Sequence, residues 1–278
     1  MKNAIFSGIR FMTLGFSRRV AAALAAAVLA AAGCRTTYTT LVQDRDTVTQ
    51  LAPFLYILSG NYDGALTVAQ FKAAGNFGIG TFEGLDGEAV LLDGVAYQVK
   101  GDGSVTLPED TRHMPYGACT LFDDDLRRTM KNIASFEVFS KALEAHFEDK
   151  QIFYAVKAHG VFSAMRVRSC DKQEKPYRPL AEVTKQQHEY TYTQTRGTLI
   201  GFWTPPFVPG AMGVPGFHLH FLSDDRTQGG HVLDFQAPAL AITLDPTPRI
   251  TIDFSTPVGV PLVDRDIDRQ VYDSERKH

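Results

Sequence analysis

Apolar residues alternate with polar ones along most of this chain, and the alternation predicts a fold rich in β-strands. The Asp93-Gly94 pair predicts a tight turn between two of these strands, and His159-Gly160 predicts the turn of a hairpin. Bounded by such turn signals, the pattern predicts strands over residues 78–82, 88–92, 95–99, 153–158, 161–167, 191–203, 217–222, 231–236, 240–244 and 250–254.

Helical spacing of apolar residues is confined to a few segments. Residues 64–74 predict a short helix that stops at Gly75-Asn76, and residues 265–275 predict a charged terminal helix. Residues 124–150 predict a helix broken near Ser135. We expect its apolar stripe to pack in the core, and the stripe consists of Phe136, Phe139, Leu143 and Phe147.

A polar, proline-containing segment at residues 173–180 is the clearest internal boundary. It separates an expected N-terminal mixed-sheet subdomain, residues 34–172, from a β-rich subdomain, residues 173–262, with a tail helix within residues 263–278. The predicted fold class is therefore α/β of the α+β kind, with two β-sheet-based subdomains and flanking helices.

The first 33 residues have the pattern of an export signal, because a basic stretch precedes an apolar run at residues 20–32. Cys34 follows small residues, as in a bacterial lipoprotein signal, but Ala31 stands where leucine is usual, so ordinary secretion stays open. We expect an exported protein, either periplasmic or anchored to the membrane only through lipid on Cys34, with secretion as the alternative. The basic residues are Lys2, Arg10, Arg18 and Arg19.

The net charge and the cysteines bear on which partners the protein binds and on whether it holds a disulfide. Residues 1–33 hold four of the 28 basic residues and none of the 31 acidic ones, so the remaining chain has a net charge of −7. That balance argues against nucleic acid as a partner. Two cysteines lie beyond Cys34, and we expect Cys119 and Cys170 to be independent buried thiols, with a disulfide as the alternative in an oxidising compartment.

The segment Gly-Phe-His-Leu-His-Phe at 216–221 carries the main chemical signal. Side chains at i and i+2 share one face of a strand, so His218 and His220 project together while their apolar neighbours face the other way. His231 returns after a short polar loop. Three imidazoles on two antiparallel strands of the C-terminal part can hold a zinc-type ion and leave one position open. Alternatively, one histidine of a chance pair satisfies a hydrogen bond in the core.

Several motifs occur in the order found in α-acetolactate decarboxylases, and the chain resembles this family from about residue 39 to residue 262. The motifs are Leu85-Asp86-Gly87-Glu88 after Gly80-Thr81-Phe82, Gln173-Glu174-Lys175-Pro176-Tyr177, Arg196-Gly197-Thr198, and the two histidine segments 216–221 and 229–234.

The resemblance implies a metal-dependent lyase, with Zn2+ or another divalent metal, that converts (S)-2-acetolactate to (R)-acetoin and CO2. It implies a fold of two sheet-based parts and a possible homodimer. It assigns the metal ligands to His218, His220 and His231. It further assigns catalytic roles to Glu88, Arg168 and a C-terminal glutamate, for which Glu275 is the candidate, and a substrate-binding role to Thr81. Arg166, two residues earlier, is the residue most easily confused with Arg168.

The chemistry agrees with these assignments, because loss of CO2 places negative charge next to the ketone of the substrate. A Lewis-acidic metal stabilises that charge, a guanidinium can bind a carboxylate, and a glutamic acid can protonate one face.

Two other functions stay open. A cupin-like metal enzyme also uses His-x-His with a later histidine, but it expects a glutamate where Ser223, Asp224 and Asp225 stand. The other function is that of an inactive exported binding module. Metal analysis together with an assay for acetoin distinguishes both alternatives from the decarboxylase.

Overall fold

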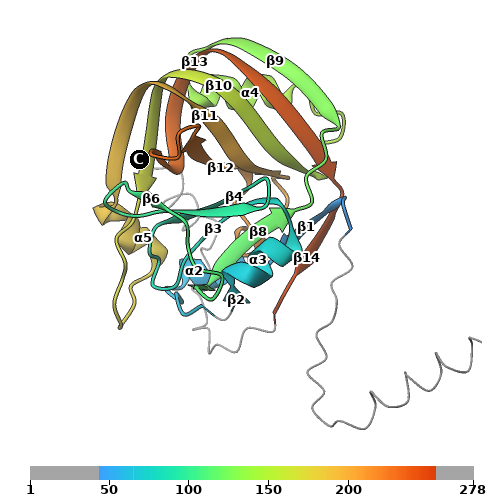
Figure 1. Cartoon of the computed structure of the whole chain (residues 1–278). Coiled ribbons are helices and arrows are strands. Elements are labelled where there is room, and N and C mark those ends of the chain that lie inside the picture. Colours follow the sequence, from blue (N-terminus) through green and yellow to red (C-terminus); the bar gives the residue numbers. More distant parts are fainter. Residues whose placement is uncertain (1–43, 65, 255–278) are drawn as a thin grey trace, which may run out of the picture. The chain divides into compact units, whose positions relative to one another are not determined.

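The computed structural model describes residues 44–254 apart from residue 65, and two large sheets with a few short helices account for most of them (Figure 1). This arrangement confirms the predicted α+β fold. The expected signal, Cys34, the tail helix and Glu275 lie outside the described residues. Within the described part of the chain, the helices are too short or too polar to cross a membrane.

The first sheet has seven strands in the order β14-β1-β8-β3-β4-β5-β6, antiparallel except for β1 beside β14. The predicted turn at Asp93-Gly94 joins β4 to β5, and both residues have positive φ, as a tight hairpin turn requires. The strands are β1 (Thr47–Gln50), β3 (Phe77–Thr81), β4 (Glu88–Leu92), β5 (Val95–Val99), β6 (Val105–Thr106), β8 (Tyr116–Thr120) and β14 (Arg249–Ile252).

The second sheet is antiparallel and has five strands, β9 (Leu126–Ile133), β10 (Phe153–Ser169), β11 (His188–Thr204), β12 (Gly216–Ser223) and β13 (Gly229–Thr247). Strand β10 pairs with β11 on one edge and β13 on the other, while β12 pairs with both β11 and β13. These four strands therefore close into a ring, and β9 adds to the free edge of β13.

The helices are short, and each begins at a recognisable signal. The helix predicted over residues 64–74 begins at Val68, because Thr67 and Gln70 form a capping box. Ser135 caps the helix that follows it by accepting a hydrogen bond from the Val138 amide. The remaining elements are α2 (Phe54–Leu58), α3 (Val68–Ala74), α4 (Phe136–Glu144), α5 (Leu180–Val183), the 3-10 turns Thr184–Gln186 and Gly210–Met212, and the small sheet of β2 (Leu66–Thr67) and β7 (His113–Met114).

Three predicted elements were wrong, each because long-range strand pairing outweighs a local signal. The first half of the helix predicted over 124–150 is β9, which pairs with β13. The hairpin predicted at His159-Gly160 is one continuous strand, β10, and Gly160 lies where a Cβ would meet the Ala239 carbonyl oxygen at 2.7 Å. The two strands predicted over 231–244 are also one strand, β13.

The division between the sheets does not follow the boundary expected at residues 172 and 173. Strands β9 and β10 precede that boundary and belong to the five-stranded sheet, whereas β14 follows it and joins the seven-stranded sheet. The described residues belong to one compact unit. The linker pattern at residues 173–180 therefore marks a loop rather than the point where one sheet ends and the other begins.

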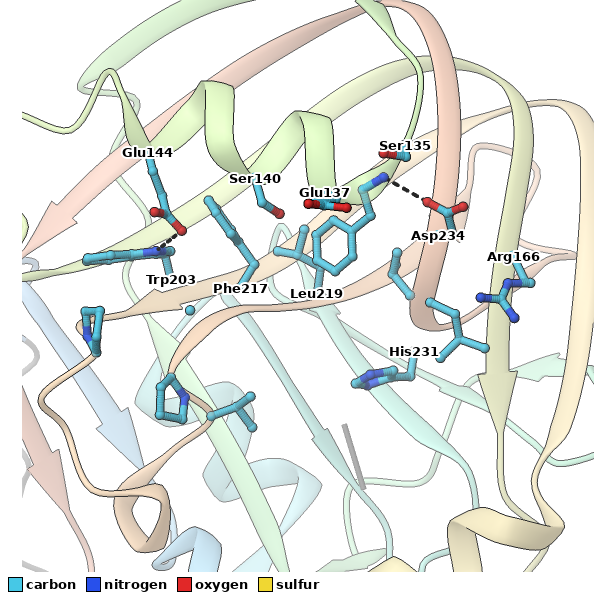
Figure 2. A pocket seen from close by; sticks show the side chains of 17 residues that line it. Ser135, Glu137, Ser140, Glu144, Arg166, Trp203, Phe217, Leu219, His231 and Asp234 are labelled. Carbon is cyan, nitrogen blue, oxygen red and sulfur yellow. Dashed lines mark hydrogen bonds between the residues drawn. The ribbon is translucent and has the colours of Figure 1, made fainter. Parts of the chain in front are cut away.

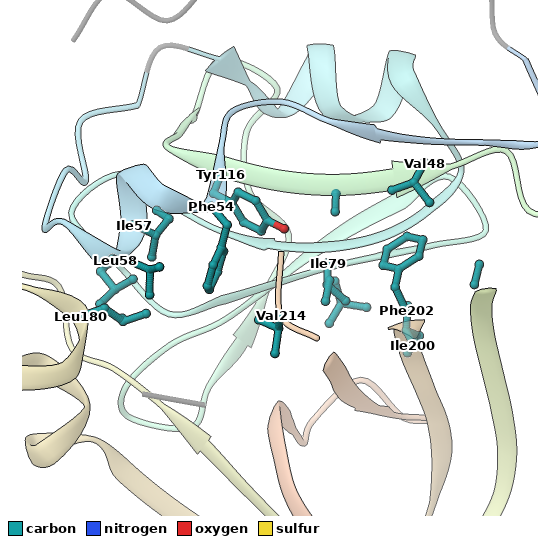
Figure 3. Close-up of a cluster of buried hydrophobic side chains, with 14 of the residues drawn as sticks. Val48, Phe54, Ile57, Leu58, Ile79, Tyr116, Leu180, Ile200, Phe202 and Val214 are labelled. Carbon is teal, nitrogen blue, oxygen red and sulfur yellow. The ribbon is translucent and has the colours of Figure 1, made fainter. Parts of the chain in front are cut away.

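The central core lies between the two sheets (Figure 3). Ile79 from the seven-stranded sheet and Ile200 and Phe202 from the five-stranded sheet are buried in this cluster, and α2 contributes Phe54 and Ile57. Burial of each such side chain contributes roughly 1.5–3 kcal/mol relative to exposure. This packing fixes one sheet against the other.

A second core cluster joins α4 to the five-stranded sheet. Phe139 and Leu143 of α4 are fully buried against Trp203, Phe217 and Phe235. The aromatic stripe predicted for this helix therefore packs in the core, as expected.

Candidate metal centre

Strand alternation separates the histidines of β12 from its apolar residues. Phe217, Leu219 and Phe221 are buried in the cluster that contacts α4. His218 and His220 consequently project from the opposite face, toward the seven-stranded sheet, where they line a cavity with residues of β3 and β4.

The third histidine comes from the neighbouring strand. His231 on β13 lies directly opposite His220 on β12. One ring nitrogen from each of His218, His220 and His231 lies within 4.8 Å of the others, and the ring centroids are 5.0–5.4 Å apart. Three imidazoles at this spacing could hold a divalent metal ion and leave a coordination position for a ligand.

Two glycines before His231 allow the strands to come this close. A Cβ on Gly229 would lie 2.7 Å from Val99 and 2.8 Å from the Phe221 carbonyl oxygen. Gly230 has a φ of +141°, and a Cβ there would lie 2.7 Å from the Arg168 carbonyl oxygen. The Gly-Gly-His sequence is therefore a steric requirement for placing His231 between β10 and β12.

The polar surroundings of His220 suit a metal ligand. Its Nδ1 lies 2.9 Å from the Ala89 carbonyl oxygen, so Nδ1 must carry the hydrogen and Nε2 must offer its lone pair. Nε2 is buried and makes no hydrogen bond. Burial, and to a lesser degree the neighbouring His218, hold the pKa of His220 well below its ordinary value. A neutral imidazole with an unsatisfied buried lone pair is the form that binds a metal.

Glu88 and Arg168 lie beside the histidines. Glu88 begins β4, and its Oε2 is 3.4 Å from His220 Nε2 while its Oε1 is 3.9 Å from Arg168 Nη1. Arg168 is on β10 and lies directly opposite His231 of the adjacent strand β13. Both charged side chains are nearly buried, with 12% and 4% of their surface exposed. A buried carboxylate and a buried guanidinium therefore face the same small volume as the three imidazoles.

Thr81 completes the set from β3, where it lies opposite Glu88. Its hydroxyl donates a hydrogen bond of 2.7 Å to the Gly87 carbonyl oxygen and is buried. Thr81 thus both lines the cavity and restrains the residue before Glu88.

The cavity enclosed by these residues is small, about 30 Å3. One wall is apolar and comes from α2 and α5, through Phe54, Ile57 and Leu180. The Phe54 ring packs edge-on against His218 at 6.2 Å between centroids. The sequence patterns did not single out these wall residues, because their only signal is hydrophobicity, which ordinary core residues share.

Other residues considered from the sequence lie elsewhere. Arg166 contacts Glu189 at 3.2 Å and lines a larger cavity, about 780 Å3, between α4 and strands β12 and β13 (Figure 2). Asp224 is 3.2 Å from His159 Nε2, so it belongs to the loop after β12 and not to the histidine cluster. Cys119 and Cys170 are both buried thiols rather than a disulfide.

A model of the family described as alpha-acetolactate decarboxylase matches residues 48–258 of this chain. An alpha-acetolactate decarboxylase from Methanosarcina mazei is 39% identical over 202 residues, covering 73% of this chain and 70% of the relative. One from Brevibacillus brevis is 39% identical over 191 residues, covering 68% of this chain and 66% of that relative. This chain therefore spans about two thirds of the length of the Brevibacillus protein.

Solved structures agree with the sequence matches. The crystal structure of alpha-acetolactate decarboxylase from Bacillus subtilis strain 168 superposes with a TM-score of 0.80 at 29% identity. The match covers 83% of this chain and 99% of the other.

Proposed function

The chain belongs to the alpha-acetolactate decarboxylase family, and we propose that it converts 2-acetolactate to acetoin and CO2 at the histidine centre. The observation that carries this proposal is the convergence of three imidazoles, Glu88 and Arg168 on one cavity. The reaction needs stabilisation of negative charge, a cation for a carboxylate and a proton donor, and these side chains supply all three.

His218, His220 and His231 are the proposed ligands of a divalent metal, with zinc as the first choice. When bound, the metal supplies a Lewis acid that stabilises negative charge on the oxygens of the substrate. Neutral imidazoles leave the charge of the ion uncancelled, and the depressed pKa of His220 supports that form. The hydrogen bond from His220 to the Ala89 carbonyl oxygen holds the ring in position.

Arg168 is the proposed partner of the substrate carboxylate. Its guanidinium is buried beside the cavity, where paired donors can bind a carboxylate and where little water competes. After CO2 leaves, the same positive charge offsets the charge that remains on the substrate oxygens.

Glu88, in its carboxylic acid form, is the proposed proton donor; after the transfer it is a carboxylate that must take up a proton before the next turnover. Its carboxyl group lies next to both His220 and Arg168, on the side of the cavity formed by the seven-stranded sheet. A donor fixed on one side of the substrate delivers its proton to one face, and the proposed stereochemical course is (S)-2-acetolactate to (R)-acetoin. Thr81 helps to hold Glu88 through its hydrogen bond to Gly87.

The test is acetoin release from racemic acetolactate by the purified protein, with and without chelator and added zinc. We expect chelator-sensitive acetoin formation that nearly stops at half conversion, because one enantiomer is consumed first. Bound metal without acetoin would reject the decarboxylase and leave a different metal enzyme or a binding module.

A further inference from the structure

The turn that precedes Glu88 has an unusual backbone. Gly84, Leu85 and Gly87 all have positive φ, and a Cβ on Gly87 would lie 2.1 Å from the Val99 carbonyl oxygen. A non-glycine residue such as Leu85 rarely adopts this conformation. Such a turn persists only where surrounding groups hold it, and it carries both Leu85 and Glu88 into the cavity.

Side chains from three separate segments hold this turn. The side-chain amide of Gln98 donates a hydrogen bond of 2.6 Å to the Asp86 carbonyl oxygen. The Thr81 hydroxyl donates one of 2.7 Å to the next carbonyl oxygen, that of Gly87. The third is Arg112, whose Nη2 is 2.6 Å from Asp86 Oδ2. Two consecutive peptide groups immediately before Glu88 are therefore fixed from outside the turn.

Arg112 is itself anchored at its backbone. Its N–H donates to the Glu109 carbonyl oxygen at 3.0 Å, and its carbonyl accepts from the Val68 amide at the start of α3 at 2.9 Å. Its ion pair with Asp86 is mostly shielded from water, with 32% and 17% of the two side chains exposed. A shielded, charge-assisted contact from a fixed base restrains the turn far more than an exposed pair would.

We propose that Arg112 is a positioning residue for Glu88, acting through Asp86, an inference that rests on the role proposed above for Glu88. Arg112 lies outside the substrate cavity and lines a separate surface groove, so it has no direct contact with reacting atoms. Its ion pair keeps the turn in the conformation that aims Glu88 at the space beside His220. Loss of the pair lets the turn relax, which changes the rate of the step that uses Glu88 and leaves the histidine centre intact.

The test compares Arg112→Gln in the wild-type chain and in a Glu88→Gln background, measuring kcat, KM, bound metal and thermal stability. We expect kcat to fall at least tenfold in the wild-type chain, with KM within threefold and metal content unchanged. In the Glu88→Gln background the same change should alter kcat less than twofold, because the group it positions is already gone. An equal loss in both backgrounds, or no loss in the wild type, overturns the proposal.

Two further variants make the result specific. Lys72→Gln removes a pair of the same 2.6 Å length, with Asp110, that touches neither the turn nor the cavity, and it should leave kcat unchanged. Arg112→Lys keeps a charge at the site and should recover part of the rate. If Arg112→Gln does not fold, Asp86→Asn removes the same ion pair with almost no change of shape and is read in the same way.

Amide hydrogen exchange separates this inference from the proposed function. Arg112→Gln should speed exchange in a peptide covering residues 82–88 at least tenfold and leave peptides from β12 and β13 unchanged. Unchanged exchange at residues 82–88 rejects the positioning role, whatever the activity. An inactive wild type, or a Glu88→Gln variant as fast as wild type, rejects the proposed function and is recognised without the Arg112 variants.

Discussion

His220 and His231 face each other across β12 and β13, at the last of the three residue pairs that join these strands. Beyond this pair β13 continues along β10, whereas β12 continues along β11. The two histidines therefore lie where the strands begin to part. Each imidazole is held by its own strand, and His218 joins them from the next position on the same face of β12.

Removal of one imidazole should severely weaken metal binding. His218→Ala leaves two ligands, and we expect metal affinity to fall by roughly 100-fold or more, with loss of acetoin formation. Metal content after gel filtration and the rate of acetoin release measure both effects. His159→Ala is the control, because His159 contacts Asp224 away from the cavity. Full activity in a metal-free His218→Ala protein would contradict the site.

Glu88→Gln should separate metal binding from catalysis. The amide keeps the shape of the carboxylate but cannot donate an acidic proton, so kcat should fall by about 10²–10⁴ while metal content stays the same. Single-turnover kinetics with metal analysis provide the measurement. Glu83→Gln, a change in an exposed neighbour of the same turn, should have little effect. A Glu88→Gln rate equal to wild type removes Glu88 from the proton-donor role.

Arg168→Lys tests the carboxylate partner. Lysine keeps the charge but loses the paired donors, and we expect kcat/KM for acetolactate to fall by about 10²-fold, mainly through KM. Arg166→Lys is the matched control on the same strand, because Arg166 contacts Glu189 and lies outside the small cavity. If the Arg166 variant shows the larger loss, the assignment of the two arginines is reversed.

Gly230→Ala should damage the histidine centre through the backbone. The new Cβ meets the Arg168 carbonyl oxygen at 2.7 Å, and φ of +141° is strained for alanine, so unfolding free energy should drop by roughly 1–3 kcal/mol. Metal affinity should drop too, because His231 must shift. Gly94→Ala carries only the φ penalty, since nothing lies within 4 Å there, and should leave metal binding intact. Chemical denaturation and metal titration compare the two.

Asp245 should make stability depend on pH. This fully buried carboxyl group accepts a hydrogen bond from the Asp123 amide, and burial, with smaller effects of nearby carboxylates, raises its pKa to about 7 from 3.8. Between these values the folded chain holds a proton that the unfolded chain releases. Stability should therefore fall as pH rises from about 4 to 7 and level off above that range.

Asp245→Asn removes the titrating group. Relative to wild type, the variant should gain roughly 1–3 kcal/mol in unfolding free energy between pH 5 and pH 8. Urea denaturation at the two pH values measures the difference. Asp110→Asn, at an exposed carboxylate, should show no such gain. Parallel pH profiles of the wild type and the Asp245→Asn variant would show that Asp245 does not titrate in this range.

Local patterns were sufficient for the parts of the fold that depend on neighbouring residues. The common face of His218 and His220 follows from strand alternation. The turn follows from the Asp93-Gly94 pair, because these residue types favour the positive φ that both positions adopt. The hairpin predicted at His159 failed because continuous pairing of β10 with β11 and β13 outweighs a local Gly signal.

The cavity could be predicted only in part. The family motifs predicted site roles for Thr81, Glu88 and Arg168. In the structure these residues line one cavity with the three histidines. Phe54 and Leu180 could not be predicted as cavity residues. They come from short helices distant in the chain, and nothing in an apolar side chain indicates whether it will border a site or another apolar residue.

The candidate site is divided between two sheets, with Thr81 and Glu88 on one and the histidines and Arg168 on the other. A substitution at the interface, such as Ile79→Ala or Phe202→Ala, would change the spacing between Glu88 and His220 without touching either residue. A screen for inactive variants would thus identify residues that pack between the sheets as well as residues that take part in the reaction. Metal content separates the histidine variants from all the others, because all three histidines belong to a single sheet. Selection for activity in this chain therefore also acts on the buried residues that pack between its two sheets.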